Sequence, residues 1–547
     1  MSPQSSSGPQ RSARVAFLAL ESYPFETPTD YMASFSYAVR KLEASLRADP
    51  SVGECETTVI DLHTSDIDEF FEAVRAYKPT LVAMSVYIWS VAPFLRLAKR
   101  IKEHDPSIAI VMGGPSARPS VLALPPYRTL VRYVDAVVIG EGEQIIRALV
   151  KNDVTEWRNI PGLHLPNPLG GLRSTGEGER IVLDDFPSPY QLGTAPARHI
   201  GYVETFRGCP MSCAFCQWGD ARPDRVHGAE YLTSHLRGLV AANVTEIMFL
   251  DAGLNLSPRA LRNLMVAERE VGALRDIHFH GHLYPTHMDK LFLELLDRTR
   301  RPARMAIGIQ SFDPDVLRTV DRPFNYDRFL GVLRDLHSRI PIDLEIIMGL
   351  PGDTPSAFRK TIETAISVAD SVRVFWPLVL PDALLERSEE FGLEFDHESF
   401  RLIRSHGWTN AQLIGEWEHT IAIAKTMPRH VQNDTMTSFT TPNGRVLMQP
   451  RTLSSASVES LRLAARRSGW LLEDARYSER SGLRFVFGRD DGKVDLEVDH
   501  GHAGEHSFVL RDGVAYSHHG DLAHELAAPV RTLIDTIHDA TKVLLAS

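Results

Sequence analysis

Residues 209–216 read Cys209-Pro210-Met211-Ser212-Cys213-Ala214-Phe215-Cys216, three cysteines at the spacing C-x3-C-x2-C. The loop follows a strand-like run from Ile200 to Phe206, and Gly208 leads into it. Thiolates are the natural ligands of iron–sulfur clusters, and a four-iron cluster needs four ligands. Three cysteines in one short loop therefore predict a cluster whose remaining iron is open to a ligand that the protein does not supply.

Zinc and disulfide bonds explain this loop less well. A structural zinc site takes four protein ligands, and Cys55 is the one cysteine outside the loop. A histidine could complete a zinc site, but C-x3-C-x2-C is not a usual half-site. Disulfide bonds within the loop would leave one of its three thiols unpaired. We therefore favour the iron–sulfur interpretation.

Length and composition predict a protein of several domains. A chain of 547 residues exceeds one hydrophobic core, so about two to four domains are expected. The 59 basic and 70 acidic side chains give a net charge of −11, which excludes a global electrostatic footprint for nucleic acid. No apolar run approaches the roughly 20 residues that span a membrane. Residues 1–13 are expected to be a disordered tail rather than a signal peptide, and four cysteines in so long a chain indicate the reducing cytoplasm.

Strand and helix patterns alternate over residues 14–151. Apolar runs predict strands at 15–20, 57–62, 80–86, 109–113 and 136–139, with helices at 31–48, 67–77 and 91–104. This order predicts a doubly wound, Rossmann-like parallel sheet. Ligands of such sheets lie beyond the carboxyl ends of the strands. Those ends carry Ser85, Tyr87, Trp89, Gly113, Gly114, Glu141 and Gly142.

A second alternation follows a region rich in proline and glycine. Residues 152–198 are expected to be a linker with an extended segment around Arg180 to Leu183. Strands are then predicted at 200–206, 246–250, 277–282, 305–309, 343–348 and 372–378. The cysteine loop follows the first of these strands.

The cysteine loop and this second alternation resemble the radical SAM superfamily. Its C-x3-C-x-aromatic-C loop, in which Phe215 supplies the aromatic residue, holds a [4Fe–4S] cluster that offers its open iron to S-adenosylmethionine (SAM). Six strand–helix units match the partial (β/α)6 barrel of that superfamily, whose site lies at the carboxyl ends of the strands. Gly-Ile-Gln-Ser, ending at Ser311, and Gly-Leu-Pro-Gly-Asp, ending at Asp353, look like its fourth- and fifth-strand signatures. The resemblance covers residues 14–390, with the barrel at 199–390.

By position, the resemblance implies three cluster ligands and a set of SAM contacts. The ligands are Cys209, Cys213 and Cys216. The SAM contacts are Phe215, Asp251, Gly253, Asn255, Gln310 and Glu345. At Gly253 the missing side chain would let SAM approach the backbone. The second-strand motif departs from the usual Gly-Gly-Glu of the family, since residues 251–255 read Asp-Ala-Gly-Leu-Asn.

Residues 14–151 resemble the cobalamin-binding domain that precedes many radical SAM domains. In that family a serine in the third strand and two glycines after the fourth make room for the nucleotide tail, as Ser85 and Gly113-Gly114 would here. The seven strand-end residues are thus the implied cobalamin contacts. The alternative is a flavodoxin-like domain with no ligand or with a different one.

One departure concerns the axial ligand of cobalt. Cobalamin proteins with a histidine ligand carry Asp-x-His-x-x-Gly after the first strand, but residues 21–25 read Glu-Ser-Tyr-Pro-Phe. Asp61-Leu62-His63 follows the second strand and lacks the glycine, so we treat it as a coincidence. Cobalt is therefore not expected to bind histidine. The hypothesis is that Trp89 or Tyr87 covers its lower face.

Three histidines alternate along the third predicted barrel strand. His278, His280 and His282 therefore point to one face. If that face is the barrel interior, an imidazole of His280 or His282 could hold the substrate or move a proton in catalysis. The alternative is that these histidines are packed in the core or at an interface.

Residues 391–547 lose the resemblance and are expected to form a smaller α+β domain that caps the barrel. Helices are predicted at 400–417, 418–427, 455–468 and 522–545. Two strand-like runs, 483–488 and 493–498, bracket Arg-Asp-Asp-Gly and predict a hairpin.

The resemblance implies a cobalamin-dependent radical SAM methyltransferase. The reduced cluster would cleave SAM to methionine and a 5′-deoxyadenosyl radical, which would take hydrogen from a carbon of the substrate; methylcobalamin would then deliver the methyl group. The implied substrate is a specialised metabolite or peptide precursor, as in antibiotic biosynthesis. The implied partner is a flavodoxin- or ferredoxin-like electron donor, with no nucleic acid and no membrane.

Three other functions stay open. One is polar methylation of an aromatic such as an indole, without an adenosyl radical. A second is radical ring rearrangement or cyclisation, in which the methyl group of SAM never reaches the product. The third, a non-catalytic corrinoid sensor or carrier, leaves the cysteine loop hard to explain.

Overall fold

The computed structural model describes most of the chain. The described residues are 13–20, 35–62, 65–167, 170–196, 200–218, 221–288, 290–299, 304–322, 324–337, 339–442, 444, 462, 465–466, 469–478, 482–489, 492–500, 506–510 and 515–517. The predicted tail, the loop 21–25, His63 and the helices predicted at 455–468 and 522–545 lie wholly or mostly outside them. Two compact units divide the chain: Ser36–Pro196 and Tyr202–Gly444 belong to the first, and the segment after Gly444 to the second.

Within the described residues, the N-terminal domain is built on a seven-stranded sheet in the order β2-β1-β3-β4-β5-β6-β7. Pairing is parallel from β2 to β5 and antiparallel from β5 to β7. The strands are β1 Ala13–Leu20, β2 Cys55–Leu62, β3 Leu81–Ser85, β4 Ala109–Gly113, β5 Ala136–Val138, β6 Leu163–Pro166 and β7 Leu172–Ser174. The predicted doubly wound parallel sheet is confirmed.

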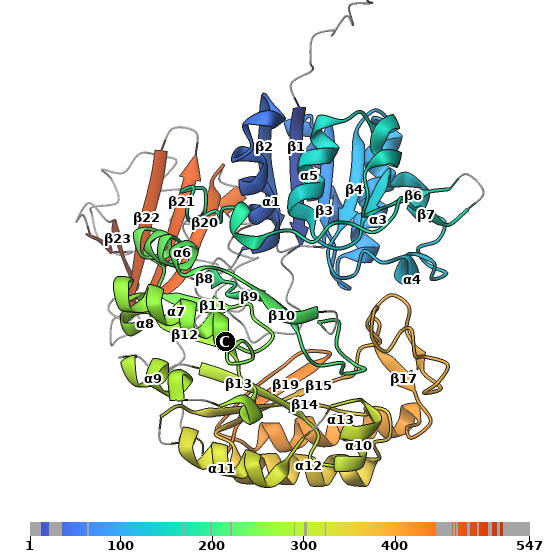
Figure 1. Ribbon diagram of the computed structural model, residues 1–547. Coiled ribbons are helices and arrows are strands. Elements are labelled where there is room, and N and C mark those ends of the chain that lie inside the picture. The colour runs from blue at the N-terminus through green and yellow to red at the C-terminus, as the bar shows by residue number, and fades with distance from the viewer. Residues whose placement is uncertain are drawn as a thin grey trace, which may run out of the picture. The chain divides into compact units, whose positions relative to one another are not determined.

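Helices cover both faces of this sheet (Figure 1). They are α1 Tyr37–Arg47, α2 Ile67–Tyr77, α3 Val91–His104, α4 Pro119–Leu122 and α5 Gly142–Lys151. Strand β1 alternates between two cores: Leu18 packs with Phe94 of α3, whereas Phe17 packs with Val39 of α1 and Ile145 of α5. This alternation explains why β1 reads as a continuous apolar run, as buried parallel strands do.

The segment 152–198 is not a plain linker. Strands β6 and β7 form an antiparallel hairpin that extends the N-terminal sheet at β5. Gly170 and Gly171, which indicated a linker, lie between the two strands with φ values of 98° and 73°. Strands of four and three residues are too short to give a periodic signal. A 3-10 helix, Leu183–Asp185, lies at the end of the segment that was expected to be extended.

The second sheet has eight strands among the described residues, in the order β18-β19-β15-β14-β13-β12-β11-β8. Pairing is parallel from β11 to β15. The strands are β8 Ile200–Val203, β11 Glu246–Phe249, β12 His278–His282, β13 Arg304–Gln310, β14 Ile342–Ile347, β15 Ser371–Phe375, β18 Arg429–Gln432 and β19 Met436–Thr440. The intervening helices are α6 Ala229–Ala241, α7 Pro258–Val271, α8 Ala273–Asp276, α9 Lys290–Arg298, α10 Pro314–Thr319, α11 Tyr326–His337 and α12 Pro355–Val368. The six predicted barrel strands are confirmed, and helices lie in each of the five connections between them.

The barrel sheet continues past residue 390, where a new domain was expected to begin. Strand β19 pairs antiparallel with β15, and β18 with β19. The helix predicted over 400–417 is also wrong in its first half: β17 (Leu402–Arg404) pairs with β16 (Glu394–Phe395), and α13 spans Asn410–Lys425. A capping box between Thr409 and Gln412 starts α13 and explains why the helix does not extend backwards.

The second unit contains a five-stranded antiparallel sheet in the part that is described. Its strands are β20 Leu471–Ser478, β21 Gly482–Arg489, β22 Gly492–His500, β23 His506–Leu510 and β24 Ala515–Ser517. Pairing of β21 with β22, which ends with Arg489 opposite Gly492, confirms the predicted hairpin.

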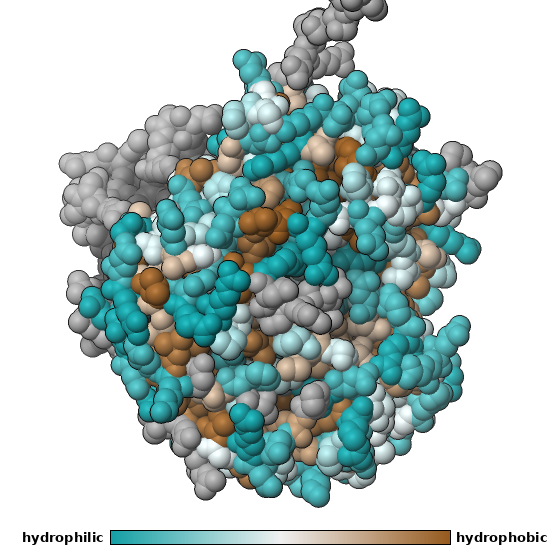
Figure 2. All heavy atoms as spheres, in the orientation of Figure 1, coloured by the Kyte–Doolittle hydropathy of each residue, from teal (hydrophilic) through white to brown (hydrophobic). Residues whose placement is uncertain are grey.

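The surface carries mixed polar and apolar side chains. On the face shown in Figure 2, hydrophobic residues lie in small groups between hydrophilic ones. Among the described helices, none has both the length and the apolar character needed to cross a membrane.

Candidate active site

The cysteine loop leaves from a short strand that is separate from β8. Strand β9 (Phe206–Cys209) pairs antiparallel with β10 (Ala221–Val226), so a hairpin carries the loop. Asp251, which follows β11, fixes the turn between β8 and β9: its Oδ1 accepts the backbone N–H of Thr205 at 2.8 Å and of Phe206 at 3.1 Å. Burial raises the pKa of Asp251 to about 7 despite these hydrogen bonds.

The three cysteines of the loop are free thiols that lie near one another. Cys213 is buried, and Cys209 and Cys216 are partly buried. Burial raises the pKa of Cys209 and of Cys216, and the neighbouring cysteines raise it further. Among the described residues, no three ligating side chains converge as they would around a single ion. The thiolates of a cluster each bind a different iron, so they need no such convergence.

Arg322, which sequence reasoning missed, lies against the cysteine loop. Its Nη1 is 3.4 Å from Sγ of Cys213, and its Nη2 donates to the carbonyl of Gly308. Its guanidinium also lies over the rings of Tyr284, at 4.9 Å, and of Phe215, at 5.8 Å. A cation that donates to a cysteine sulfur fits a cluster of net negative charge.

Tyr284 packs against Arg322 near the same three thiols. Burial raises the pKa of Tyr284 to about 12; Arg322 opposes the shift and the three cysteines add to it. The phenol therefore stays protonated at neutral pH, and its hydroxyl is buried without a hydrogen-bond partner among the described residues.

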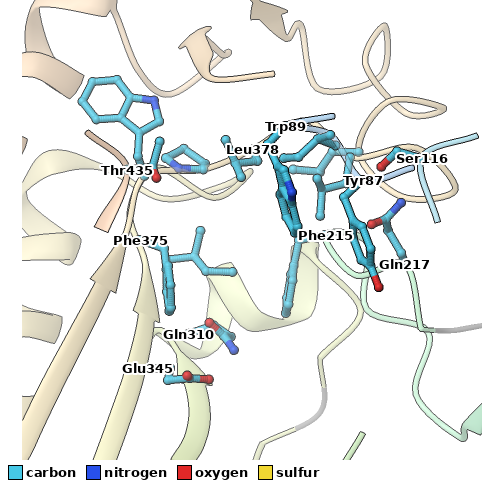
Figure 3. Close-up of a pocket in the computed structure, with 16 residues that line it drawn as sticks. Tyr87, Trp89, Ser116, Phe215, Gln217, Gln310, Glu345, Phe375, Leu378 and Thr435 are labelled. Carbon is cyan, nitrogen blue, oxygen red and sulfur yellow. The ribbon is translucent and has the colours of Figure 1, made fainter. Parts of the chain in front are cut away.

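A cavity of about 360 Å³ connects the N-terminal domain with the barrel (Figure 3). Both parts belong to the first compact unit. The cavity is lined by Tyr87, Ile88, Trp89, Ser116, Phe215, Gln217, Gln310, Glu345, Ile347, Phe375, Trp376, Pro377, Leu378, Leu380, Leu384 and Thr435. Loops after β3 and β4, the cysteine loop and the ends of β13, β14 and β15 thus meet around one space.

Gln310 and Glu345 lie together at one end of this cavity, as Figure 3 shows. Gln310 ends β13 with φ of 70°, and its Oε1 is buried without a hydrogen-bond partner in the part of the chain that is described. A Cβ at Gly308 would come within 2.5 Å of the Gln310 amide, so the glycine makes room for this side chain. Glu345 Oε1 accepts from Arg373 Nη1 at 3.1 Å.

The three histidines do share one face of β12, as predicted. Phe279 and Gly281 between them are buried on the other face. His280 Nε2 lies 3.0 Å from Glu246 Oε2, while His282 Nε2 lies 3.4 Å from Glu345 Oε2. The Glu345 carboxylate raises the pKa of His282, whose side chain is half exposed. His282 therefore contacts a residue that lines the cavity, whereas His280 pairs with a neighbouring strand.

Two of the predicted SAM contacts have other partners. The Asn255 amide donates to the backbone carbonyl of Tyr284 at 2.7 Å and accepts its N–H at 2.9 Å, and so joins two strand-end loops. Asp251 holds the turn before the cysteine loop. A Cβ at Gly253 would lie 3.1 Å from the Leu256 side chain, so the position is tight. As SAM contacts, all three stay predictions.

In the N-terminal domain, Tyr87 and Trp89 reach the cavity at its other end (Figure 3). Their rings stack at 4.7 Å with an interplanar angle of 6°, and Trp89 Nε1 donates to the carbonyl of Leu20 at 2.9 Å. A Cβ at Gly114, where φ is 106°, would come within 2.8 Å of the Val86 carbonyl, so only glycine fits there.

The other predicted cobalamin contacts do not line the cavity. Ser85 is buried at the end of β3, and Gly113 precedes Gly114. Glu141 accepts the N–H of Ile181 at 2.9 Å and pairs with two arginines of the cysteine hairpin. A Cβ on Gly142 would lie 3.0 Å from the Leu42 side chain. As cobalamin contacts, Ser85, Gly113, Gly114, Glu141 and Gly142 stay predictions.

Family models match both halves of this arrangement. Residues 203–365 match the radical SAM superfamily, and residues 36–150 match the B12-binding domain. The chain joins a cobalamin-binding domain to a radical SAM domain. The first domain implies cobalamin, and the second implies SAM and a [4Fe–4S] cluster.

Known methyltransferases resemble the chain in sequence and in fold. It is 29% identical over 351 residues to the cobalamin-dependent radical SAM methyltransferase TokK of Streptomyces tokunonensis, covering 58% of this chain and 50% of TokK. It is 30% identical over 349 residues to a 2-(S-pantetheinyl)-carbapenam-3-carboxylate methyltransferase of Streptantibioticus cattleyicolor, covering 57% and 49%. The chain thus spans about half the length of these curated relatives. The structure of the radical SAM methyltransferase TsrM from Kitasatospora setae shares the fold, with a TM-score of 0.55, 18% identity and coverage of 79% of this chain and 86% of TsrM.

Proposed function

We propose that the chain is a cobalamin-dependent radical SAM methyltransferase, which methylates a carbon atom of a small-molecule or peptide precursor in specialised metabolism. The observation that carries the proposal is that one cavity is lined by Tyr87 and Trp89 of the cobalamin-binding domain, Phe215 of the cysteine loop, and Gln310 and Glu345 at the barrel strand ends. Similarity to TokK and to the carbapenam methyltransferase supports transfer of a methyl group.

The residues present suit the implied cofactors. Three neighbouring thiols with Arg322 against one of them suit the cluster, and the orphaned Gln310 Oε1 suits a polar ligand such as the ribose of SAM. Glycines beside backbone at the strand ends suit a ligand in close approach. When bound, the cluster supplies the electron that cleaves SAM, and cobalamin supplies the cobalt centre that accepts and passes on a methyl group.

The side chains of the protein position the bound cofactors and set the charge around them. Arg322 offsets negative charge at the thiolates. The ion pairs of Glu345 with Arg373 and His282 fix its carboxylate at the cavity wall. His282, whose pKa the Glu345 carboxylate raises, binds a proton there more readily than a free imidazole does. Trp89 and Tyr87, whose stacked rings line the cavity, would contact bound cobalamin.

Anaerobic reconstitution with iron, sulfide and hydroxocobalamin tests this function. We expect about four irons and one corrinoid per chain after desalting. With methyl-labelled SAM and a reductant, the holoenzyme should release S-adenosylhomocysteine, which forms when SAM loses its methyl group, and 5′-deoxyadenosine, which forms on reductive cleavage. In the triple Cys→Ala variant of Cys209, Cys213 and Cys216, 5′-deoxyadenosine should be absent.

Other outcomes would support the other functions. S-adenosylhomocysteine without 5′-deoxyadenosine would favour polar methylation. 5′-deoxyadenosine without transfer of label would favour radical rearrangement or cyclisation. Corrinoid binding without formation of S-adenosylhomocysteine or 5′-deoxyadenosine would favour a non-catalytic corrinoid sensor or carrier. Reductive cleavage of SAM needs an electron from outside the chain, so we also propose a flavodoxin- or ferredoxin-like electron donor. We propose that the protein acts in the reducing cytoplasm.

A further inference from the structure

Arg207 joins the cysteine hairpin to the cobalamin-binding domain. Its Nη1 lies 3.1 Å from Glu141 Oε1, and its Nη2 lies 2.9 Å from Glu143 Oε1. Its Nε donates to Glu204 Oε1 at 2.7 Å. The Arg207 guanidinium thus binds two carboxylates of the N-terminal domain and the carboxylate of Glu204, which lies between β8 and β9. Arg207 itself is two residues before Cys209, the first cysteine of the loop.

Glu141 binds an arginine on each strand of the cysteine hairpin, β9 and β10. Arg207 of β9 stands opposite Arg225 of β10 in the strand register. Both guanidinium groups bind Oε1 of Glu141. Two like charges on opposite residues repel unless an anion lies between them. Glu141 therefore holds together β9 and β10, the two strands on either side of the cysteine loop.

At its other end the ion-pair cluster of Arg207 lies beyond the carboxyl end of β5. Glu141 is the first residue before α5, and Glu143 lies in the first turn of that helix. Strand β5 ends at Val138, and in such sheets the loops after the strand ends surround the ligand. A shift of this edge is therefore transmitted to β9 through two charge-assisted hydrogen bonds, one from the Arg207 guanidinium to Glu141 and one to Glu143.

The surroundings are buried and shared by both domains. Lys41 of α1 donates to the Tyr231 hydroxyl of α6 at 2.6 Å, and burial lowers its pKa to about 8 despite the nearby carboxylates of Glu204 and Glu143. Burial alone would raise the pKa of Glu204, but Arg207 outweighs it and holds the pKa well below its usual range. The groups of this cluster are thus tightly coupled.

Stability alone is a weak reason for such a cluster. Buried ion pairs often contribute no more stability than hydrophobic residues of similar size, because desolvation offsets the attraction. What they add is geometry, since the planar fork of arginine fixes both distance and direction to its carboxylates.

We propose that Arg207 is a positioning residue that sets the place of the cysteine loop relative to the β5 edge of the cobalamin-binding domain. The inference rests on the proposed function, since that distance matters only if the loop and that domain hold cofactors that act on the same SAM. A displacement of about 1 Å between reacting groups can cost about a hundredfold in rate.

Arg207→Lys is the test variant. A lysine keeps the charge but offers one ammonium group, which cannot meet three carboxylates in the geometry of the guanidinium fork. The matched control is Arg237→Lys on α6, because Arg237 pairs with Glu270 at the surface, with side chains 64% and 52% exposed. Glu143→Gln removes one partner of Arg207 and should act in the same direction.

The first readout does not depend on turnover. In protein reconstituted with cluster and cobalamin and then reduced, pulsed EPR measures the coupling between the cluster and Co(II). We expect one defined coupling in the wild type and in Arg237→Lys, and a shifted or broadened one in Arg207→Lys. Equal coupling in all three proteins, with iron and corrinoid contents unchanged, would overturn the inference.

The second readout is the ratio of the two products of SAM. Release of S-adenosylhomocysteine needs the correct placement of the cobalamin-binding domain relative to the barrel. Release of 5′-deoxyadenosine needs only the barrel with its cluster. We expect the ratio of the first product to the second to fall about tenfold or more in Arg207→Lys. A parallel loss of both would indicate a structural role and contradict positioning. If the wild type forms neither product, the proposed function fails, and the EPR coupling alone decides the inference.

Discussion

Arg322 Nη1 donates a hydrogen bond to Cys213 Sγ across 3.4 Å, although the two residues are 109 positions apart. A cluster gains negative charge on reduction, so a neighbouring cation stabilises the reduced form more than the oxidised form. Arg322→Gln should therefore lower the reduction potential. A hydrogen bond with a charged group contributes about 1.5 kcal/mol, which corresponds to about 60 mV for one electron.

An EPR-monitored redox titration measures this shift. Arg318→Gln is the control, because Arg318 pairs with Asp315 at the surface, where the two side chains are 73% and 76% exposed. An unchanged potential in Arg322→Gln, with cluster content intact, would show that the contact does not tune the cluster.

Gln310→Leu should weaken SAM binding without weakening the fold. Gln310 Oε1 is buried without a partner among the described residues, so its loss removes no internal hydrogen bond. If this oxygen accepts from a hydroxyl of SAM, the KM for SAM should rise about tenfold, which corresponds to about 1.4 kcal/mol. Thermal unfolding should show an equal or higher Tm. A lower Tm with unchanged KM would contradict the assignment.

Trp89→Ala should open the lower face of bound cobalt. In the structure the indole stacks on Tyr87 and is held by the carbonyl of Leu20. The wild-type absorption spectrum should show no nitrogen ligand, even with added imidazole. The variant should bind imidazole, with a shift of the corrinoid bands. Trp157→Phe, a buried change in the other core of the same domain, serves as the control.

His282→Gln and His280→Gln separate the two predicted catalytic histidines. His282 holds Glu345 at the cavity wall, whereas His280 pairs with Glu246 away from the lining residues. We expect His282→Gln to slow product formation from SAM about tenfold and to change its pH profile, since it removes a group with a raised pKa. His280→Gln should stay within about twofold of the wild type. Equal effects would remove the distinction.

Local patterns in the sequence predict most of the scaffold. The cysteine loop is predicted by its spacing, and buried strands such as β3 and β4 by continuous apolar runs. Short strands are missed by such patterns. Strands β6 and β7 have four and three residues, and the proline and two glycines between them resemble a linker.

The site is less predictable because it depends on contacts between distant residues. Arg322 meets Cys213 across 109 positions, and Arg207 meets Glu141 across 66. The periodicity of apolar residues in the sequence does not predict contacts between residues so far apart. Glu141 shows the consequence: its place after β5 suggests a ligand contact, yet both its carboxylate oxygens are engaged by the protein.

Stability should fall as pH rises towards neutrality, in part because of Asp353. Burial raises the pKa of this carboxyl to about 7. A group whose pKa is higher in the folded state than in the unfolded state stabilises the fold below its unfolded pKa, and this contribution is lost as pH rises through the folded pKa. From pH 5 to pH 8 the apo protein should therefore lose about 3 kcal/mol at this group. In Asp353→Asn, whose amide does not titrate, urea unfolding at each pH should show a correspondingly smaller decline. If the variant declined as steeply as the wild type, Asp353 would not be the group responsible.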